Sequence, residues 1–322
     1  MPDASLLRPQ SPLLINMQAA AAAGELRQGA DGRAYVLKSP NGAASTDTAV
    51  KYLDEGQFTI TKTAGISFLD GGRVYWDRSA RAAHYKQVDD ADFFAGTAVG
   101  DAAPGDTAMT LKLNAPQLHK IELARDPFST AIIGTQALGG LALNRRGGAL
   151  NYVLSSVNEA QKLDALSKDG FGINANAIVE LAFNILNDGA GTVVDVSLGV
   201  ADGTHATDAD AIANHLFIHL DANNTTIKAQ SKSTGKTTVN ATDTTKVYVE
   251  GAGNANRKEC WFDFRDPTNV KIYIDAVRVL SGTVFDLSGA TTLYLLAHIE
   301  KTAAADTYEF DDEWHFARTA EQ

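Results

Sequence analysis

Alternating apolar and polar residues over positions 31–114 predict a series of short β-strands. In "FTITKT" (58–63), Phe58 and Ile60 alternate with threonines, and "RVYWD" (73–77) places Val74 and Trp76 on one side. Such strands recur with Gly, Pro and Asp between them, a spacing typical of a small antiparallel β-barrel. We expect the barrel core to contain Phe58, Ile60, Val74, Trp76, Leu111 and Leu113.

The alternation resumes in longer segments over residues 149–322. Examples are "AIVELAFNIL", "NVKIYIDAVRV" and "TLYLLAHIEK", separated by loops such as "NDGAGT" and "DANNTT". Many strands with alternating faces predict a two-sheet sandwich, and no βαβ alternation or Gly-rich phosphate loop is present. The sequence therefore predicts an all-β chain: an extended arm at 1–30, a barrel at 31–114, a linker with the first sandwich strand at 115–148, and a two-sheet β-sandwich at 149–322.

Composition excludes several classes of protein. The chain has 322 residues and a formal net charge of −11, which disfavours a free nucleic-acid binder because phosphate affinity needs clustered Lys and Arg. The single cysteine, Cys260, rules out an intrachain disulfide, and we expect it to be a small buried apolar residue. No apolar run reaches the length of a membrane span, and the first residues lack a basic start, so we expect synthesis and folding in a cytoplasm.

The barrel segment carries "GRAYVLKSP", "DEGQFTITKTAG", "GGRVYWDRSARAAHYKQ" and "FFAGTAVGDAAPGDTAMTLKLN" in that order. It resembles a family of small β-barrel capsid decoration (cement) proteins of tailed bacteriophages. The resemblance implies a homotrimer at threefold or quasi-threefold axes, with the major capsid protein as its partner, on the outer surface of a virion. Leu13, Leu14 and Ile15 of the arm are then expected to contact the capsid or neighbouring subunits.

The second half carries "GGALNYVLSSVNEAQKLDAL", "VELAFNI", "DVSLGVADG", "NHLFIHLDANNTTIKAQS" and a closing "YEFDDEWHF". This layout resembles the concanavalin A-like (laminin G-like) jelly-roll sandwich that is appended to phage and metagenomic structural proteins, so the resemblance implies a jelly-roll fold for this half. The family usually has Asp-Gly at a hairpin tip where this chain has Asp275-Ala276. Alanine resists the positive φ of a type I′ turn, so the turn type stays open.

The acidic run "EFDDE" is the sharpest chemical signal. Glu309, Asp311 and Glu313 alternate, so a strand would place all three on one face, as in retaining glycosidases of this fold. The run lies on the last strand, however, where acidic and apolar residues commonly alternate, and Phe310, Trp314 and Phe316 are predicted to form its core side. Structural carboxylates are therefore the favoured interpretation, and catalysis the alternative.

Two acidic loops and two histidines are weaker candidates. Asp202, Asp208 and Asp210 offer oxygen ligands for Ca²⁺, although their spacing does not fit an EF-hand loop. His215 and His219 share a strand face without a third ligand in register, so we expect neutral or solvent-facing imidazoles rather than zinc ligands. The loop residues Asp221, Asn223 and Asn224 are candidates for contact with glycans.

These observations lead to one main hypothesis and two alternatives. The main hypothesis is a phage virion protein, not an enzyme and without a cofactor, that stabilises the capsid and projects its sandwich outward. The first alternative is a carbohydrate-binding protein for host adhesion that contacts host-surface glycans. The second is a glycoside hydrolase that uses Glu309 and Glu313.

Overall fold

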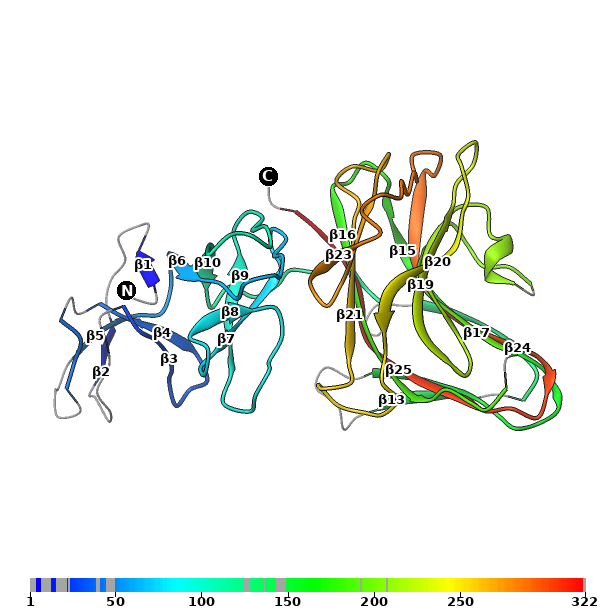
Figure 1. Cartoon of the computed structure of the whole chain (residues 1–322), viewed down its shortest axis with the longest axis horizontal. Helices are drawn as coiled ribbons and strands as arrows, with labels where there is room; N and C mark the ends of the chain where they lie inside the picture. The colour runs from blue at the N-terminus through cyan, green and yellow to red at the C-terminus, as the bar shows by residue number, and fades with distance from the viewer. Residues whose placement is uncertain are drawn as a thin grey trace. The chain divides into compact units, whose positions relative to one another are not determined.

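The structure is a computed structural model of the whole chain, and it consists almost entirely of antiparallel β-strands (Figure 1). It describes residues 4–6, 13–15, 22, 24–38, 41–44, 50–123, 128–135, 137–142, 149–191, 193–206 and 208–320. The chain divides into two compact units, which comprise Met1–Leu118 with the last two residues, and His119–Ala320. Among the described residues, no helix combines the length and apolarity that a membrane crossing would need.

The N-terminal unit contains two sheets. The six-stranded sheet has the order β1-β6-β10-β9-β7-β8, and the four-stranded sheet has the order β2-β5-β4-β3. Their strands are β1 (Ala4–Leu6), β2 (Leu13–Ile15), β3 (Leu26–Gln28), β4 (Ala34–Leu37), β5 (Val50–Leu53), β6 (Gln57–Thr61), β7 (Arg73–Asp77), β8 (Ala82–His84), β9 (Phe93–Ala98) and β10 (Ala108–Leu113).

The six-stranded sheet closes into the predicted small barrel. Its end strand β8 meets the end of β6: Lys62, which follows β6, forms a bridge with Ala83 of β8, and Thr63 N donates to Ala83 O at 3.0 Å. All the predicted core residues are at most 3% exposed, which confirms the alternation read from the sequence. These residues are Phe58, Ile60, Val74, Trp76, Leu111 and Leu113.

The segment predicted to be an extended arm contributes strands to this unit. β1 pairs with β6, β3 pairs with β4, and Leu13, Leu14 and Ile15 of β2 pair with Tyr52, Lys51 and Val50 of β5. The predicted boundary at residue 31 is therefore not a boundary of the fold. A strand of three residues is too short to show an alternating pattern, and its pairing partner lies far along the chain. Sequence periodicity therefore cannot predict it.

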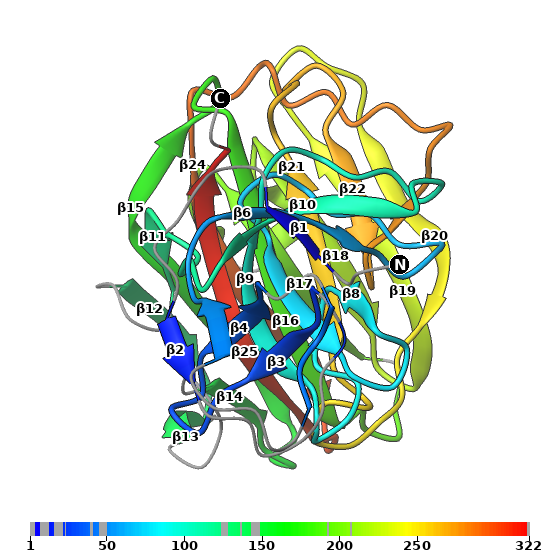
Figure 2. The same ribbon diagram turned by 90° about the vertical axis from the view of Figure 1, so that its left-hand side faces the viewer.

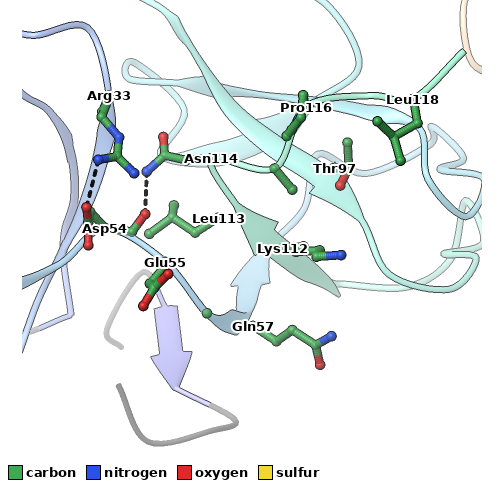
Figure 3. Close-up of a pocket in the computed structure, with 12 residues that line it drawn as sticks. Arg33, Asp54, Glu55, Gln57, Thr97, Lys112, Leu113, Asn114, Pro116 and Leu118 are labelled. Atoms are coloured by element: carbon green, nitrogen blue, oxygen red, sulfur yellow. Dashed lines mark hydrogen bonds and ion pairs between the residues drawn. The ribbon is translucent and has the colours of Figure 1, made fainter. Parts of the chain in front are cut away.

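Asn114 joins the two sheets of the N-terminal unit. Its backbone has φ of 54°, and its side chain exchanges two hydrogen bonds of 2.8 Å with the backbone of Ala34 while Nδ2 also donates to Asp54 O at 2.6 Å. Beside it lies a hollow of about 490 Å³ in which Arg33 and Asp54 form an ion pair of 2.9 Å (Figure 3). The Asn114 side chain thus provides hydrogen-bond partners for the backbone N–H and C=O groups of Ala34 in β4.

The second unit is a two-sheet sandwich, as predicted. One sheet has eight strands in the order β13-β14-β25-β16-β21-β22-β23, with β11 also paired to β25, and the other has seven in the order β12-β15-β24-β17-β18-β19-β20. The eight-stranded sheet contains β11 (Ile121–Glu122), β13 (Ala137–Ala142), β14 (Ala149–Leu154), β16 (Ala177–Asn187), β21 (Lys258–Asp263), β22 (Lys271–Ile274), β23 (Val277–Val279) and β25 (Tyr308–Thr319). The seven-stranded sheet contains β12 (Phe128–Ile133), β15 (Glu159–Gly172), β17 (Val194–Ala201), β18 (His215–Asp221), β19 (Asn224–Lys232), β20 (Val239–Val247) and β24 (Thr292–Ala304), and a short 3₁₀ helix covers Ala209–Ala211.

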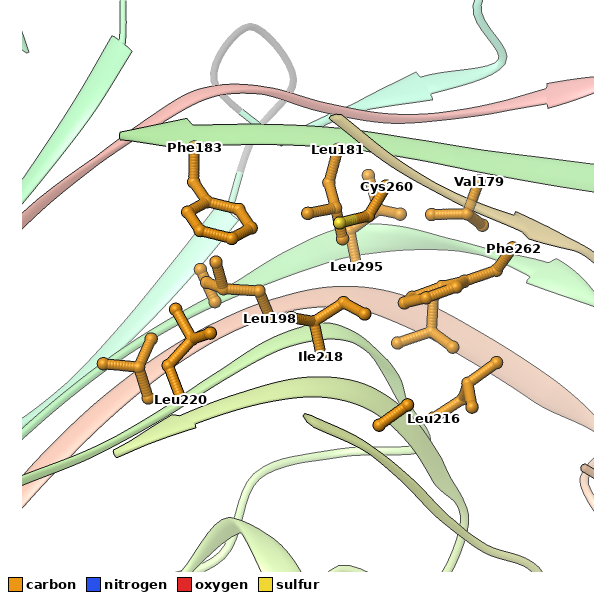
Figure 4. Packing of buried hydrophobic residues seen from close by; sticks show 14 of the residues in the cluster. Val179, Leu181, Phe183, Leu198, Leu216, Ile218, Leu220, Cys260, Phe262 and Leu295 are labelled. Carbon is orange, nitrogen blue, oxygen red and sulfur yellow. The ribbon is translucent and has the colours of Figure 1, made fainter. Parts of the chain in front are cut away.

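One apolar core fills the space between the two sheets. Leu181, Phe183 and Cys260 of the eight-stranded sheet face Leu198 and Ile218 of the seven-stranded sheet (Figure 4). Cys260 is fully buried, as expected, and burial raises the pKa of its thiol well above the usual value. The long strands β15 and β24 lie side by side in the seven-stranded sheet (Figure 2). Because both sheets turn alternate residues inward, the intervening residues form two outer faces.

Candidate functional site

The outer face of the eight-stranded sheet carries the predicted acidic run. On β25, Tyr308 and Phe310 belong to the sandwich core, so the alternate residues Glu309 and Asp311 point away from it. Asp311 is only 1% exposed, whereas Glu309 is partly exposed. The Asp311 carboxylate is therefore buried, and the Glu309 carboxylate lies at the surface.

A β-bulge at Glu313 brings the third carboxylate to this face. Asp312 pairs with Phe183 and Trp314 pairs with Ala182, so Glu313 is the extra residue between two consecutive pairs. A bulge bends its strand and re-aims side chains, and such features gather near functional sites.

The same bulge corrects one prediction. Phe310 is a core residue, as expected, but Trp314 and Phe316 lie on the outer face because the inserted residue reverses the alternation. Beyond the bulge, His315 and Ala317 point inward instead. Sequence alternation cannot reveal an insertion of one residue, because a period of two is lost at that point without any change in composition.

Two amide side chains hold the three carboxylates. Asn151 on β14 donates Nδ2 to Glu309 Oε1 at 3.0 Å and to Asp311 Oδ1 at 2.8 Å. Asn184 on β16 donates Nδ2 to Glu313 Oε1 at 2.7 Å. In each of these bonds the carboxylate oxygen is the acceptor, and each lies within normal hydrogen-bond range. The three carboxylates are thus ordered by strands on both sides of β25.

On the other side of the bulge, the indole of Trp314 lies on the same outer face. The guanidinium carbon of Arg257 lies 4.4 Å from the centre of the Trp314 ring, and Arg257 Nη2 is 3.0 Å from Glu259 Oε1. Farther along, Arg318 Nε donates to Glu180 Oε1 at 2.7 Å. A cation over an indole face is favourable and also fixes the ring plane. Trp314 is partly exposed, so the face combines an ordered indole with carboxylates and amides.

Sequence reasoning found the acidic run but missed the residues that organise it. Asn151 and Asn184 belong to two other strands, Arg257 immediately precedes β21, and none of the three has a motif of its own. Only the strand register places them beside β25, with Asn151 and Asn184 both opposite Asp311. No single-chain pattern provides that register, because it depends on which distant strands pair.

The structure does not gather the three aspartates proposed as calcium ligands. Each has a local partner: Asp202 Oδ2 accepts from Asn214 at 2.6 Å, Asp208 Oδ1 accepts from Asp210 N at 2.7 Å, and Asp210 Oδ1 accepts from Gln230. Within the described part of the chain, they do not belong to any group of side chains that could hold a metal ion. Their bonds shape the β17–β18 connection instead.

The candidate glycan-facing loop is a tight hairpin between β18 and β19. Asn223 has φ of 53° at the turn, a conformation that asparagine tolerates, and Asn224 Oδ1 accepts from Thr226 N at 3.1 Å. Asp221 is held by Asn224, Lys228 and His219. The structure therefore uses the three residues for turn formation and side-chain pairing; glycan contact by this loop stays a prediction.

The two strand histidines differ from expectation in one respect. His215 and His219 are 3% and 7% exposed, so neither faces solvent. Burial lowers the pKa of His215, which agrees with the predicted neutral imidazole, and its ring stacks on Phe217 with centres 4.5 Å apart. In the part of the chain that the structure describes, the pair has no third ligand: His219 lies near Asp195 of β17 and Asp221, and His215 does not belong to that group.

Comparison with known proteins relates the sandwich to solved structures. No protein-family model and no curated protein matches the sequence. The carbohydrate recognition domain of Emp47p is similar over 62% of this chain and 94% of that one, with 15% identity and a TM-score of 0.41. Alginate lyase AlyC3 in complex with dimannuronate (54% and 75%, 12% identity, TM-score 0.37) and a non-specific endo-β-1,3(4)-glucanase of family GH16 (53% and 74%, 12% identity, TM-score 0.35) are similar too.

The expected fold class is confirmed: the chain is all-β, with a two-sheet β-sandwich after small N-terminal sheets. The likeness is confined to the fold of the sandwich. At these identities and TM-scores, no activity or ligand of the similar proteins is transferred to this chain.

Proposed function

We propose that the sandwich binds carbohydrate on the outer face of its eight-stranded sheet. The observation that carries this proposal is the ordered row of Glu309, Asp311 and Glu313, next to the indole of Trp314 on the same face. Sugar rings present hydroxyl groups around an apolar C–H face. Carboxylates and amides pair with hydroxyls, and a fixed indole packs against C–H groups, so this face offers both kinds of contact.

We further propose that the face binds sugar without cleaving it. A retaining glycosidase needs one carboxylate as nucleophile and another as acid/base on either side of the scissile bond. Here Asn151 and Asn184 already engage the three carboxylates as acceptors. That arrangement suits fixed recognition of hydroxyl groups, and the glycoside hydrolase remains the alternative that the experiment below separates.

The test is a glycan-array screen of the full chain, followed by affinity measurements on the best ligand. Trp314→Ala should weaken binding at least tenfold, and the matched control Leu118→Ala, which truncates an apolar side chain 73% exposed in the N-terminal unit, should leave it unchanged. The proposal fails if no array glycan binds, or if Trp314→Ala binds as well as wild type. Release of shorter sugars by wild type, lost in Glu309→Gln or Glu313→Gln, would instead establish the hydrolase.

A second part of the proposal concerns the N-terminal unit. We infer that this unit decorates a tailed-phage capsid as a trimer, with the major capsid protein as partner and the outer virion surface as location. Its support is the resemblance of residues 35–114 to cement proteins, together with the closed barrel those residues form. A protein that binds only the assembled lattice stabilises it through linkage, and many symmetric contacts add by multivalency. The sandwich would then offer the particle loose adsorption to host glycans.

Quantitative mass spectrometry of purified particles tests this part. The expected result is a copy number close to that of the major capsid protein. A few copies per particle would favour a tail location, and absence from particles would refute the virion role without touching the carbohydrate proposal.

A further inference from the structure

The outer face of the seven-stranded sheet carries a buried polar band that the proposed carbohydrate face does not use. Opposite residues on four adjacent strands form a row of Asp164, His298, Ser197 and His219. All four are at most 7% exposed. Burying polar side chains is costly unless they are bonded, so a band of this kind needs a reason for its presence.

The next row of the band holds a convergent group of ligand atoms. Asp195 on β17 lies directly opposite Asp221 on β18 and Glu300 on β24. One ligand atom each from Asp195, His219 and Asp221 lies within 4.8 Å of the other two. Two carboxylates and an imidazole drawn from adjacent strands are therefore held at the separation that a shared ion would bridge.

His219 supplies the only imidazole of this group, and its ring is buried. Its side chain is 7% exposed, and its Nε2 lies 2.9 Å from Asp221 Oδ1. Its Nδ1 is buried without a hydrogen-bond partner among the described residues. A buried ring nitrogen without a partner costs free energy. Nε2 is the nitrogen on the Asp221 side, so a shared ion would bind at Nε2 in place of the present hydrogen bond, and the ring proton would then lie on Nδ1.

Access and charge also favour a cation. Asp195 is exposed and lines a cavity of about 230 Å³ together with Glu300 and Lys162. Of the two lysines that line the cavity, Lys162 pairs with Asp164 at 2.8 Å and Lys301 donates to backbone carbonyl groups. Lys228 pairs with Asp221, and a bound ion would compete with it for that carboxylate. For Asp195, the structure records no ion pair or hydrogen bond within its described part. A cation entering from the cavity would meet this carboxylate first.

We propose that Asp195, His219 and Asp221 bind one divalent transition-metal ion. Imidazole is a ligand typical of zinc and its neighbours, whereas all-oxygen sites suit Ca²⁺ and Mg²⁺. Three protein ligands leave a coordination position open toward the cavity, where Glu300 or an external oxygen ligand can complete the sphere. The ion would tie β17 to β18, and the site is independent of the proposed carbohydrate face.

The experiment uses the full chain without a histidine tag, stripped with EDTA and dialysed against Zn²⁺. Wild type should retain one zinc per chain and gain thermal stability on loading, since a ligand that binds the folded state shifts unfolding. Asp195→Asn should lower the zinc affinity about tenfold or more. The matched control Asp169→Asn changes an exposed aspartate on β15 of the same sheet and should bind zinc as wild type does.

Asp195 is exposed, so its variant should fold, and circular dichroism verifies this. The proposal is overturned if wild type retains no stoichiometric zinc, or if Asp195→Asn binds it as tightly as wild type. Tight binding of Ca²⁺ with no zinc affinity would overturn the assignment to the transition-metal class.

Discussion

Arg257 lies over the indole ring of Trp314, with its guanidinium carbon 4.4 Å from the ring centre. Arg257 immediately precedes β21, and Trp314 lies on β25 of the same sheet. The bulge at Glu313 turns the Trp314 side chain to the outer face, where it meets Arg257. Arg257 is thereby a positioning residue for the aromatic part of the proposed carbohydrate face.

Replacing Arg257 tests this positioning role. Arg257→Lys keeps the charge but loses the planar stack, and a cation–π contact of this kind is worth about 0.5–1 kcal/mol. We expect sugar affinity to fall by roughly twofold to fivefold, as that energy range implies, with little change in unfolding temperature. Calorimetric titration measures the affinity. An affinity unchanged from wild type would show that the stack does not order the binding face.

Asn151 is predicted to be essential for the stability of the carboxylate row. Asn151→Asp replaces the amide that donates to Glu309 and Asp311 with a third negative charge, in a place where Asp311 is 1% exposed. The lost bonds and the repulsion should cost about 1–3 kcal/mol at pH 7. Urea unfolding provides the measurement, with Asn240→Asp at an exposed position of β20 as the control. Equal stability of the two variants would contradict the proposed organisation.

Stability should depend on pH through His298. Burial opposes its charge, but the partners Asp164 and Glu300 outweigh burial and raise the pKa of His298 to about 9. A raised folded-state pKa stabilises fully below the unfolded value of 6.5, and that contribution disappears as pH rises through about 9. The shift corresponds to about 3 kcal/mol as an order of magnitude.

Urea unfolding at pH 6 and pH 9.5 checks this dependence. Wild type should be markedly less stable at the higher pH, and His298→Gln should lose most of that difference. Lys162 faces the same group and pairs with Asp164 at 2.8 Å. A pH dependence that persists in His298→Gln would assign it to other residues.

The hairpin tip between β22 and β23 stores backbone strain. Asp275 and Ala276 have φ of 51° and 61°, which resolves the open turn type in favour of the type I′ class with positive φ at both positions. Glycine adopts this conformation freely, so Ala276→Gly should stabilise the chain by about 0.5–1 kcal/mol. Thermal unfolding measures the change. A lower midpoint would show that packing of the buried alanine methyl outweighs the strain.

Alternation was sufficient to predict the barrel core and the sandwich from sequence, because Phe58 and Trp76 or Leu181 and Phe183 repeat with the period that a buried strand face requires. The same reasoning failed at Trp314, where one inserted residue reversed the faces, and at Leu13–Ile15, where pairing comes from a distant strand. The clusters around Asn151 and Asp195 depend on register between strands far apart in sequence, which alternation within a strand does not specify.

The most direct measurement is the dissociation constant of the best array glycan for wild type and Trp314→Ala, determined by calorimetric titration on the full chain. Binding on the carboxylate and indole face predicts at least a tenfold weaker constant for the variant, since removing an indole from a contact surface removes a large apolar area. An unchanged constant would contradict the account and place any carbohydrate site elsewhere on the molecule.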